Sequence, residues 1–286
     1  MSAGNAAGPL PPAAGAPRGQ PLGLIAGSGR FPLLFARAAL EAGRELVAVA
    51  HEGETDPVIT AVAPGVTWVK LGQLGLIAEA LRAGGCTEAV FCGGIKKLRL
   101  FDVRPDWLGL KVLSRLRSFG DDAALRAISQ AMEDEGIRIV SPMPLVPGLL
   151  APRGPIGKLR FSAEQARDVE AGLHAARALG ALDLGQTVVL KRGVVLAVEA
   201  VEGTDACIAR GGALARGGGH GPVVVKVLKP GQDLRFDLPA VGPATIAALE
   251  KAGCSALAIE AGHTVLLDRE ELAAIADAAR IAVEGV

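Results

Sequence analysis

A loop in the last quarter of the chain carries the densest group of side chains suited to catalysis. Residues 229–242 read KPGQDLRFDLPAVG and contain two prolines that restrict the loop. If this segment is extended, alternation places Asp233, Arg235 and Asp237 on one face. Two carboxylates beside a guanidinium suit a divalent metal and a phosphoryl oxygen together, which predicts catalytic roles for all three and metal binding by Asp233 and Asp237. The alternative is a self-paired surface salt bridge on an edge strand, which contributes little stability. Anchoring such a loop with two prolines favours the functional interpretation.

A glycine turn near the start of the ordered sequence is a second candidate site. Gly27, Ser28 and Gly29 follow a short apolar run and precede a segment with helical spacing. The N–H groups of such a turn, together with the helix dipole, can hold a phosphate. The turn lacks a complete GxGxxG because Pro32 stands in place of the third glycine, and no acidic residue clearly ends the next strand to hold a ribose. A plain strand-to-helix turn therefore remains the alternative.

Acidic residues form two further clusters. Asp121 and Asp122 stand at the predicted start of a helix, where one of them can cap the helix, or the two can bind a metal or a ribose and base. Glu202, Thr204 and Asp205 follow a predicted strand, where open α/β sheets display ligand-binding groups. A plain Gly-Thr-Asp turn explains the second cluster equally well.

The elements that must position these residues alternate between strands and helices in the first half of the chain. Strands are predicted at 21–26, 45–50, 66–70, 89–92 and 137–140, and helices at 31–42, 76–83 and 122–135. This alternation predicts an α/β fold with a parallel, Rossmann-like sheet.

The second half has a different pattern. Residues 141–157 contain five prolines, which predicts an interdomain linker. Beyond a helix capped by Ser162, we expect strands at 187–190, 194–200, 223–228, 256–261 and 264–268, a helix at 243–252 and a C-terminal helix. The predicted organisation is a disordered leader at 1–20, a parallel-sheet domain at 21–140, the linker, and a mixed α/β domain at 158–286.

Composition excludes several classes of protein. The 286 residues include 30 Lys and Arg against 30 Asp and Glu, so the neutral chain has no general attraction for nucleic acid. Only 3% of residues are aromatic and Tyr is absent, so platforms for stacking bases are scarce. The four cysteines are widely spaced without a CxxC, which predicts neither a zinc site nor disulfides and fits the reducing cytoplasm. No uncharged apolar stretch of ~18 residues predicts a transmembrane segment.

Seven segments, taken in order, resemble the motifs of one family, the UDP-2,3-diacylglucosamine pyrophosphatases of the LpxI type. They are GLIAGSGRFP at 23–32, KLGQLG at 70–75, FGDDAALRAI at 119–128, GQTVVL at 185–190, VLAVEAVEGTDA at 195–206, KPGQDLRFDLPAVG at 229–242 and IEAGHT at 259–264. The resemblance implies hydrolysis of UDP-2,3-diacylglucosamine to UMP and 2,3-diacylglucosamine 1-phosphate (lipid X), a cytoplasmic step of lipid A synthesis. It further implies attack by water on the sugar-side phosphorus and a need for Mg²⁺, with Mn²⁺ as the alternative cation.

The resemblance also assigns roles to the two domains and to individual residues. It implies a UDP-binding N-terminal domain and a catalytic C-terminal domain that binds the lipid and sugar phosphate, with an amphipathic nucleotide-lipid substrate between them. The implied substrate-binding residues are Gly27, Ser28, Gly29, Gly72, Gln73, Asp121, Asp122, Gln186, Thr187, Glu202, Thr204, Asp205 and Lys229. Transient contact with the inner membrane surface and a homodimer are both compatible with this interpretation. The competing function is that of a non-hydrolytic nucleotide-binding protein or a nucleotide-sugar oxidoreductase, and the incomplete glycine motif counts against NAD.

Overall fold

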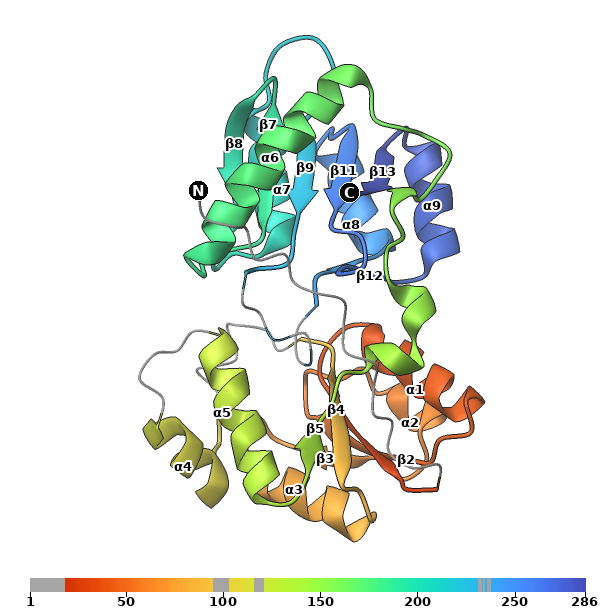
Figure 1. Ribbon diagram of the computed structural model, residues 1–286, viewed down its shortest axis with the longest axis vertical. Coiled ribbons are helices and arrows are strands. Elements are labelled where there is room, and N and C mark those ends of the chain that lie inside the picture. Colours follow the sequence, from red (N-terminus) through yellow and green to blue (C-terminus); the bar gives the residue numbers. More distant parts are fainter. Residues whose placement is uncertain (1–18, 95–102, 116–120, 231–232, 234, 236–237) are drawn as a thin grey trace, which may run out of the picture.

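The computed structural model describes residues 19–94, 103–115, 121–230, 233, 235 and 238–286, and in this part the chain forms two α/β domains stacked along its long axis (Figure 1). The N-terminal domain contains a parallel sheet and the C-terminal domain a mixed one. The fold class predicted from the sequence is therefore confirmed.

The N-terminal sheet has five strands in the order β3-β2-β1-β4-β5, all parallel. Its strands are β1 (Leu22–Ala26), β2 (Leu46–His51), β3 (Thr67–Val69), β4 (Glu88–Cys92) and β5 (Arg138–Ile139). The helices are α1 (Phe31–Glu41), α2 (Ile59–Val62), α3 (Leu74–Ala83), α4 (Trp107–Arg115) and α5 (Asp121–Asp134). Helices α2 and α4 were not expected from the sequence.

The order in which strands are added to this sheet reverses between β1 and β4. Strands β2 and β3 add on one side of β1, and β4 and β5 on the other. All five residues of β1 are buried, because helices cover both faces of a doubly wound sheet. Ligands of open α/β sheets bind outside the carboxyl ends of the strands at such a reversal, which here are Ala26 and Cys92.

The C-terminal domain is built on six strands in the order β6-β13-β11-β9-β7-β8. These are β6 (Gly154–Pro155), β7 (Thr187–Lys191), β8 (Val194–Val198), β9 (Val223–Lys226), β11 (Ala256–Ile259) and β13 (Ala282–Gly285), while β10 (Ala240–Val241) and β12 (Val265–Leu266) form a separate pair. The helices are α6 (Ala163–Ala181), α7 (Thr204–Leu214), α8 (Pro243–Lys251) and α9 (Arg269–Ala278). Strands β9, β11 and β13 are parallel, and β6, β7 and β8 run against their neighbours.

Two expectations for this domain need correction. Thr204 and Asp205 do not lie in a plain turn but begin α7, where Gly203 at the N-cap has φ +86°. The chain does not end in a helix, because α9 is followed by β13. Within the predicted linker at 141–157 the structure has two 3₁₀ turns, η2 (Met143–Leu145) and η3 (Pro147–Leu149), as well as β6.

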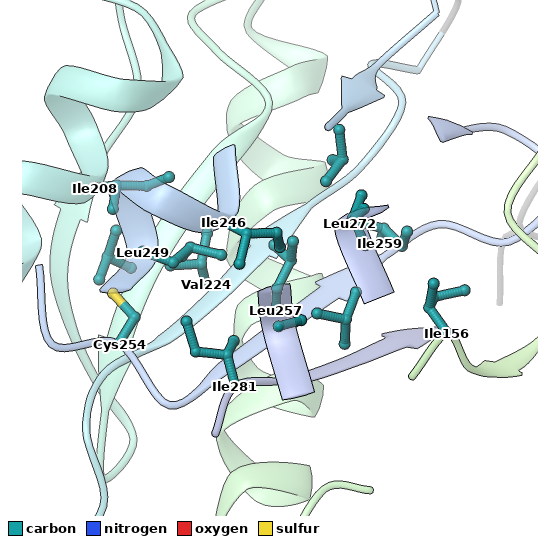
Figure 2. Close-up of a cluster of buried hydrophobic side chains, with 14 of the residues drawn as sticks. Ile156, Ile208, Val224, Ile246, Leu249, Cys254, Leu257, Ile259, Leu272 and Ile281 are labelled. Atoms are coloured by element: carbon teal, nitrogen blue, oxygen red, sulfur yellow. The ribbon is translucent and has the colours of Figure 1, made fainter. Parts of the chain in front are cut away.

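Aliphatic packing holds the C-terminal domain together. Figure 2 shows Val224 and Leu257 of the sheet meeting Ile246 and Leu249 of α8 and Leu272 of α9. All five side chains are fully buried. A core of branched aliphatic side chains explains how a chain with so few aromatic residues buries enough apolar surface.

The two domains share a hydrophobic cluster. Val265 of β12 is buried in the same cluster as Leu24, Phe35 and Met143 of the N-terminal half, and Leu150 forms an antiparallel bridge with Val265.

Within the described part of the chain, no helix is long and apolar enough to cross a membrane.

Candidate functional site

The glycine turn predicted to bind phosphate is packed against the end of β4. Gly27 N donates to Cys92 O at 2.8 Å, and Ser28 N donates to Gly94 O at 2.7 Å. A Cβ on Gly27 would lie 2.4 Å from Gly94 O, and one on Gly93 would lie 2.3 Å from Ser28 O. The glycines therefore allow two backbones to approach closely, and the amides of Gly27 and Ser28 are already used inside the protein.

Residues of β2 and of the segment after it contact the strand end that leads into this turn, and Arg30, just after the turn, contacts the C-terminal domain. The carbonyl oxygen of Ala26 lies 2.9 Å from His51 Nδ1 and accepts a hydrogen bond from Thr55 Oγ1 at 2.6 Å. Burial lowers the pKa of His51, although its contact with Ala26 and the charge of Glu54 act in the opposite direction, so this histidine is neutral at pH 7. At the start of α1, Arg30 Nε lies 3.0 Å from Asp268 Oδ2 of the C-terminal domain.

Gly72 and Gln73, which the resemblance implies bind the substrate, lie at the start of α3. Asp106 Oδ2 accepts from Gly75 N at 2.7 Å and from Leu76 N at 3.3 Å, so a carboxylate of the protein already caps this helix. The side chain of Gln73 accepts from Lys70 N at 2.7 Å. Asp121 and Asp122 begin α5, and their side chains lie outside the described part of the structure.

A buried polar cluster occupies the carboxyl edge of the C-terminal sheet. Lys226 at the end of β9 donates from Nζ to Thr204 Oγ1 at 3.1 Å and to Ala240 O at 3.3 Å. Thr204 Oγ1 donates to Glu199 Oε1 at 2.9 Å. Glu199 and Lys226 are both buried, with only 7% of each residue exposed. Thr204 was among the residues expected to bind the substrate, whereas Glu199 and Lys226 were not, although a charge that ends a β-branched run was the available signal.

Two of the predicted substrate-binding residues lie beside this cluster. Gln186 and Thr187 enter β7, which pairs with β9 so that Thr187 is opposite Lys226. Gln186 Oε1 and Thr187 Oγ1 are buried with no hydrogen-bond partner among the described residues. Unpaired buried polar atoms are rare in proteins, so this edge offers groups suited to a polar ligand.

Other predicted residues are engaged with neighbours on the protein surface. Glu202 Oε1 accepts from Arg210 Nη2 at 2.5 Å, and a hydrogen bond from its own backbone, followed by that from Arg210, lowers the pKa of Glu202. Asp205 is exposed in the first turn of α7. Lys229 Nζ donates to Asp183 Oδ1 at 2.9 Å.

Asp233 and Arg235 lie where the C-terminal domain meets the N-terminal domain. Arg235 donates to the Asp233 carboxylate from Nε at 3.0 Å and from Nη2 at 2.7 Å, while its Nη1 lies 3.6 Å from Glu133 Oε1 and 3.4 Å from Ile139 O. Neither Asp233 nor Arg235 lies in a strand, and Asp237 lies outside the described part of the chain. Burial raises the pKa of Asp233, but the hydrogen bonds from Arg235 outweigh it, so the pKa is lowered and the group is ionised at neutral pH.

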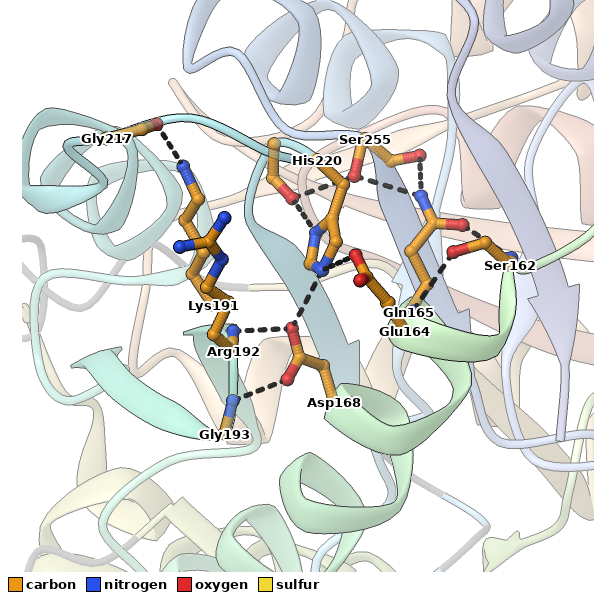
Figure 3. Close-up of polar contacts among 11 residues, drawn as sticks. Ser162, Glu164, Gln165, Asp168, Lys191, Arg192, Gly193, Gly217, His220 and Ser255 are labelled. Atoms are coloured by element: carbon orange, nitrogen blue, oxygen red, sulfur yellow. Dashed lines mark hydrogen bonds and ion pairs between the residues drawn. The ribbon is translucent and has the colours of Figure 1, made fainter.

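A second polar cluster lies at the opposite edge of the C-terminal sheet (Figure 3). Asp168 Oδ2 and Oδ1 accept from the backbone N–H groups of Arg192 at 2.8 Å and Gly193 at 2.6 Å, and His220 Nε2 lies 3.6 Å from Asp168 Oδ2. These contacts fasten the β7–β8 hairpin and the glycine-rich loop at 217–221 to α6. His220 therefore has a structural role in this cluster.

Comparison with known proteins identifies the family. The LpxI N-terminal domain matches residues 21–149 and the LpxI C-terminal domain matches residues 152–284. The chain belongs to the LpxI family. It is 38% identical over 273 residues to UDP-2,3-diacylglucosamine pyrophosphatase LpxI of Caulobacter vibrioides (strain ATCC 19089 / CIP 103742 / CB 15), which covers 93% of this chain and 97% of that protein.

One solved structure, titled "Crystal structure of gox2253", aligns with 86% of this LpxI-family chain and 78% of its own chain. Its sequence identity is 12% and its TM-score is 0.28, so the alignment carries no structural argument.

The residues at the domain junction can be tested for a fit to Mg²⁺. Among the described residues, no group of three or more His, Cys, Asp or Glu side chains is arranged to hold a metal ion. Mg²⁺ in phosphoryl-transfer sites commonly needs only one or two protein carboxylates, because substrate phosphates and water supply the other ligands. Asp233, with a side chain 20% exposed, is accessible to a cation that arrives with a diphosphate, whereas the described residues form no all-protein cage.

Proposed function

We propose that this LpxI-family chain hydrolyses UDP-2,3-diacylglucosamine to UMP and lipid X in the cytoplasm. The relative in Caulobacter vibrioides carries this substrate and reaction type in its name and matches nearly the whole chain. One geometric observation supports the proposal most strongly: Arg235, which holds the ionised Asp233, extends from the C-terminal domain to contact Ile139 and Glu133 of the N-terminal domain. A substrate with a nucleotide at one end and acyl chains at the other requires unlike surfaces meeting in this way.

The mechanism assigns the carboxyl ends of the N-terminal strands to the uridine nucleotide. The glycine turn and the starts of α3 and α5 contact the UDP end there, through Gly29, Gly72, Gln73, Asp121 and Asp122. Because internal hydrogen bonds use the amides of Gly27 and Ser28, these two residues shape the turn and bring Gly29, at φ +88°, to the surface.

The buried cluster of the C-terminal domain binds the sugar phosphate. Lys226 supplies positive charge beside Thr204, and Thr187 and Gln186 supply polar atoms that lack partners among the described residues. A low-dielectric site strengthens these interactions as negative charge builds on the phosphoryl oxygens.

Asp233 holds or orients the attacking water, and Arg235 fixes its carboxylate by two parallel hydrogen bonds. Mg²⁺, or Mn²⁺ in its place, would be held by Asp233 and Asp237 together with the diphosphate and would neutralise its charge. Attack occurs on the sugar-side phosphorus, so the oxygen of water is retained in lipid X and UMP leaves.

The test is incubation of the purified full chain with UDP-2,3-diacylglucosamine and Mg²⁺ in ¹⁸O-water, with product analysis by mass spectrometry. The expected products are unlabelled UMP and lipid X carrying one ¹⁸O. Label in UMP would overturn the direction of attack, and an absence of UMP would overturn the hydrolase assignment. A change in NAD(P)H absorbance with the nucleotide sugar would instead support the oxidoreductase alternative.

The Asp233→Ala variant tests whether Asp233 acts in catalysis and not in folding. Loss of one strong electrostatic contact in the transition state lowers kcat by on the order of 10² or more. Glu135→Ala is the matched control, because Glu135 is likewise a carboxylate paired with an arginine, Arg82, and neither residue has a proposed role in catalysis or substrate binding. Near-normal turnover of Asp233→Ala would transfer the catalytic role to Asp237 or Asp205.

A further inference from the structure

Helix α4 exposes an apolar face on the N-terminal domain. Leu108 and Val112 are buried and attach the helix to α3 and α5. On the other side Trp107 is 82% exposed, Leu110 50% and Leu113 37%. Figure 1 shows α4 at the outer edge of the domain.

This arrangement differs from the scattered apolar residues that every protein surface carries. Trp107, Leu110 and Leu113 recur at a spacing of three within a helix of nine residues, so they share one side. Among the large hydrophobic residues that the structure describes, Trp107 is the most exposed. Contiguous exposed apolar side chains mark interaction surfaces.

Two exposed basic residues lie beside the apolar face of α4. Arg104 lies just before the helix and Lys111 lies on it. The neighbouring carboxylate, Asp106, accepts from the N–H groups of Gly75, Leu76 and Gly109, so its negative charge is compensated within the protein. A basic, apolar helix with a tryptophan has the composition of helices that lie in a membrane interface.

We propose that α4 docks this protein on the surface of a bilayer that contains anionic lipids. Trp107, Leu110 and Leu113 enter the headgroup region, and Arg104 and Lys111 contact lipid phosphates. The inference rests on the proposed function in one respect, since a substrate with two acyl chains resides in a membrane. Because the apolar face is small, the contact is reversible, as it is for proteins that bind a membrane through one weak element.

A second copy of the chain is a poorer occupant. A helix of nine residues is about 14 Å long and about 10 Å wide. Its outer face is far smaller than the roughly 800 Å² that each partner buries in a standard stable interface. A bilayer needs no matching protein surface, so a short helix suffices there.

The experiment compares a double variant of the full chain, Trp107→Ser/Leu110→Ser, with a matched control, Leu182→Ser/Val201→Ser. Leu182 and Val201 are 69% and 76% exposed and lie in the C-terminal domain, so both variants remove comparable exposed apolar side chains. Circular dichroism and thermal melting establish that both variants are folded. Sedimentation with vesicles of phosphatidylcholine, with and without phosphatidylglycerol, measures binding.

We expect the parent chain and the control to bind the anionic vesicles in a salt-sensitive manner, and the Trp107→Ser/Leu110→Ser variant to bind about fivefold more weakly or worse. In a Trp68→Phe background, Trp107 emission should shift to the blue when vesicles are added. Equal binding of the two double variants, or no binding by the parent chain, would overturn the proposal. Concentration-dependent dimerisation lost only in the Trp107→Ser/Leu110→Ser variant would overturn it in favour of a second copy.

UMP release from substrate dispersed in detergent micelles separates this inference from the proposed function. The Trp107→Ser/Leu110→Ser variant should retain the parent rate in micelles and lose rate only when the substrate is presented in vesicles. An equal loss in both would overturn the docking role, whereas no release by the parent chain would instead contradict the hydrolase proposal.

Discussion

Replacing Arg235 tests whether the position of the Asp233 carboxylate matters for catalysis. Arg235 grips Asp233 with Nε at 3.0 Å and Nη2 at 2.7 Å, and a planar fork of this kind fixes both the distance and the orientation of a carboxylate. In Arg235→Gln both charge-assisted hydrogen bonds are lost, and in Arg235→Lys the charge stays but the fork is lost. Asp233 then samples several rotamers instead of one.

The expected magnitude follows from the exposure of the pair. A hydrogen bond to a charged group contributes about 1.5–3 kcal/mol when it is well shielded from solvent. The side chains of Arg235 and Asp233 are 38% and 20% exposed, so solvent screening reduces the contribution. A loss of about 1–2 kcal/mol of transition-state stabilisation corresponds to roughly 5–30-fold in kcat.

The pH dependence has a definite sign. Burial raises the pKa of Asp233, and the side-chain and backbone hydrogen bonds from Arg235 lower it by more. Removing the guanidinium leaves burial less opposed, so the pKa of Asp233 rises and the acid limb of the kcat profile moves to higher pH. Arg235→Lys keeps a positive charge and should move that limb less than Arg235→Gln.

UMP release measured across pH for both variants is the assay. Arg82→Gln, which removes a guanidinium paired with Glu135 at 2.8 Å on the N-terminal domain, is the control and should keep the parent profile. A kcat for Arg235→Gln within twofold of the parent value, together with an unmoved acid limb, would refute a catalytic role for the Asp233–Arg235 pair.

Three further predictions concern the cation and the stability of the fold. EDTA should abolish UMP release and added Mg²⁺ or Mn²⁺ should restore it, whereas full activity in metal-free buffer would contradict the role of the cation. Asp168→Ala should lower the free energy of unfolding in urea by about 2–3 kcal/mol, because two backbone N–H groups lose a charged acceptor, while the exposed Glu164→Ala should change it by less than about 0.5 kcal/mol. Gly93→Ala should cost about 3 kcal/mol or more, since its Cβ would lie 2.3 Å from Ser28 O at φ +86°, and Gly136→Ala, at φ +82° in open space, should cost only about 1 kcal/mol; equal losses for the two would contradict the close-approach argument.

The sequence alone determined the parts of the fold that depend on local patterns. The apolar runs that became β1, β2 and β4 are bounded by glycine, and a run buried on both faces needs no information from distant residues to be identified. The capping box of α6 was visible for the same reason, since Ser162 and Gln165 bond to each other's backbone across three residues.

Elements that depend on distant partners were missed. Strand β13 is four residues long and is a strand because β11 and β6 pair with its two edges. Helix α7 begins at a glycine with positive φ, which a sequence pattern represents equally well as a turn. Helix α4 keeps only Leu108 and Val112 inside, so its apolar pattern does not mark one buried face.

The candidate site depended most on tertiary structure. The sequence singled out Asp233 and Arg235 by type and spacing, but the contacts of Arg235 with Ile139 and Glu133, about 100 positions away, arise only when two domains pack together. In the sequence, Lys226 stands within an apolar run, and only the structure shows that β9 ends at this residue, beside Thr204. Charge and spacing along a chain are local properties, whereas burial and the choice of hydrogen-bond partner are decided by the packing of distant segments, and these set the protonation and position of every group in the site.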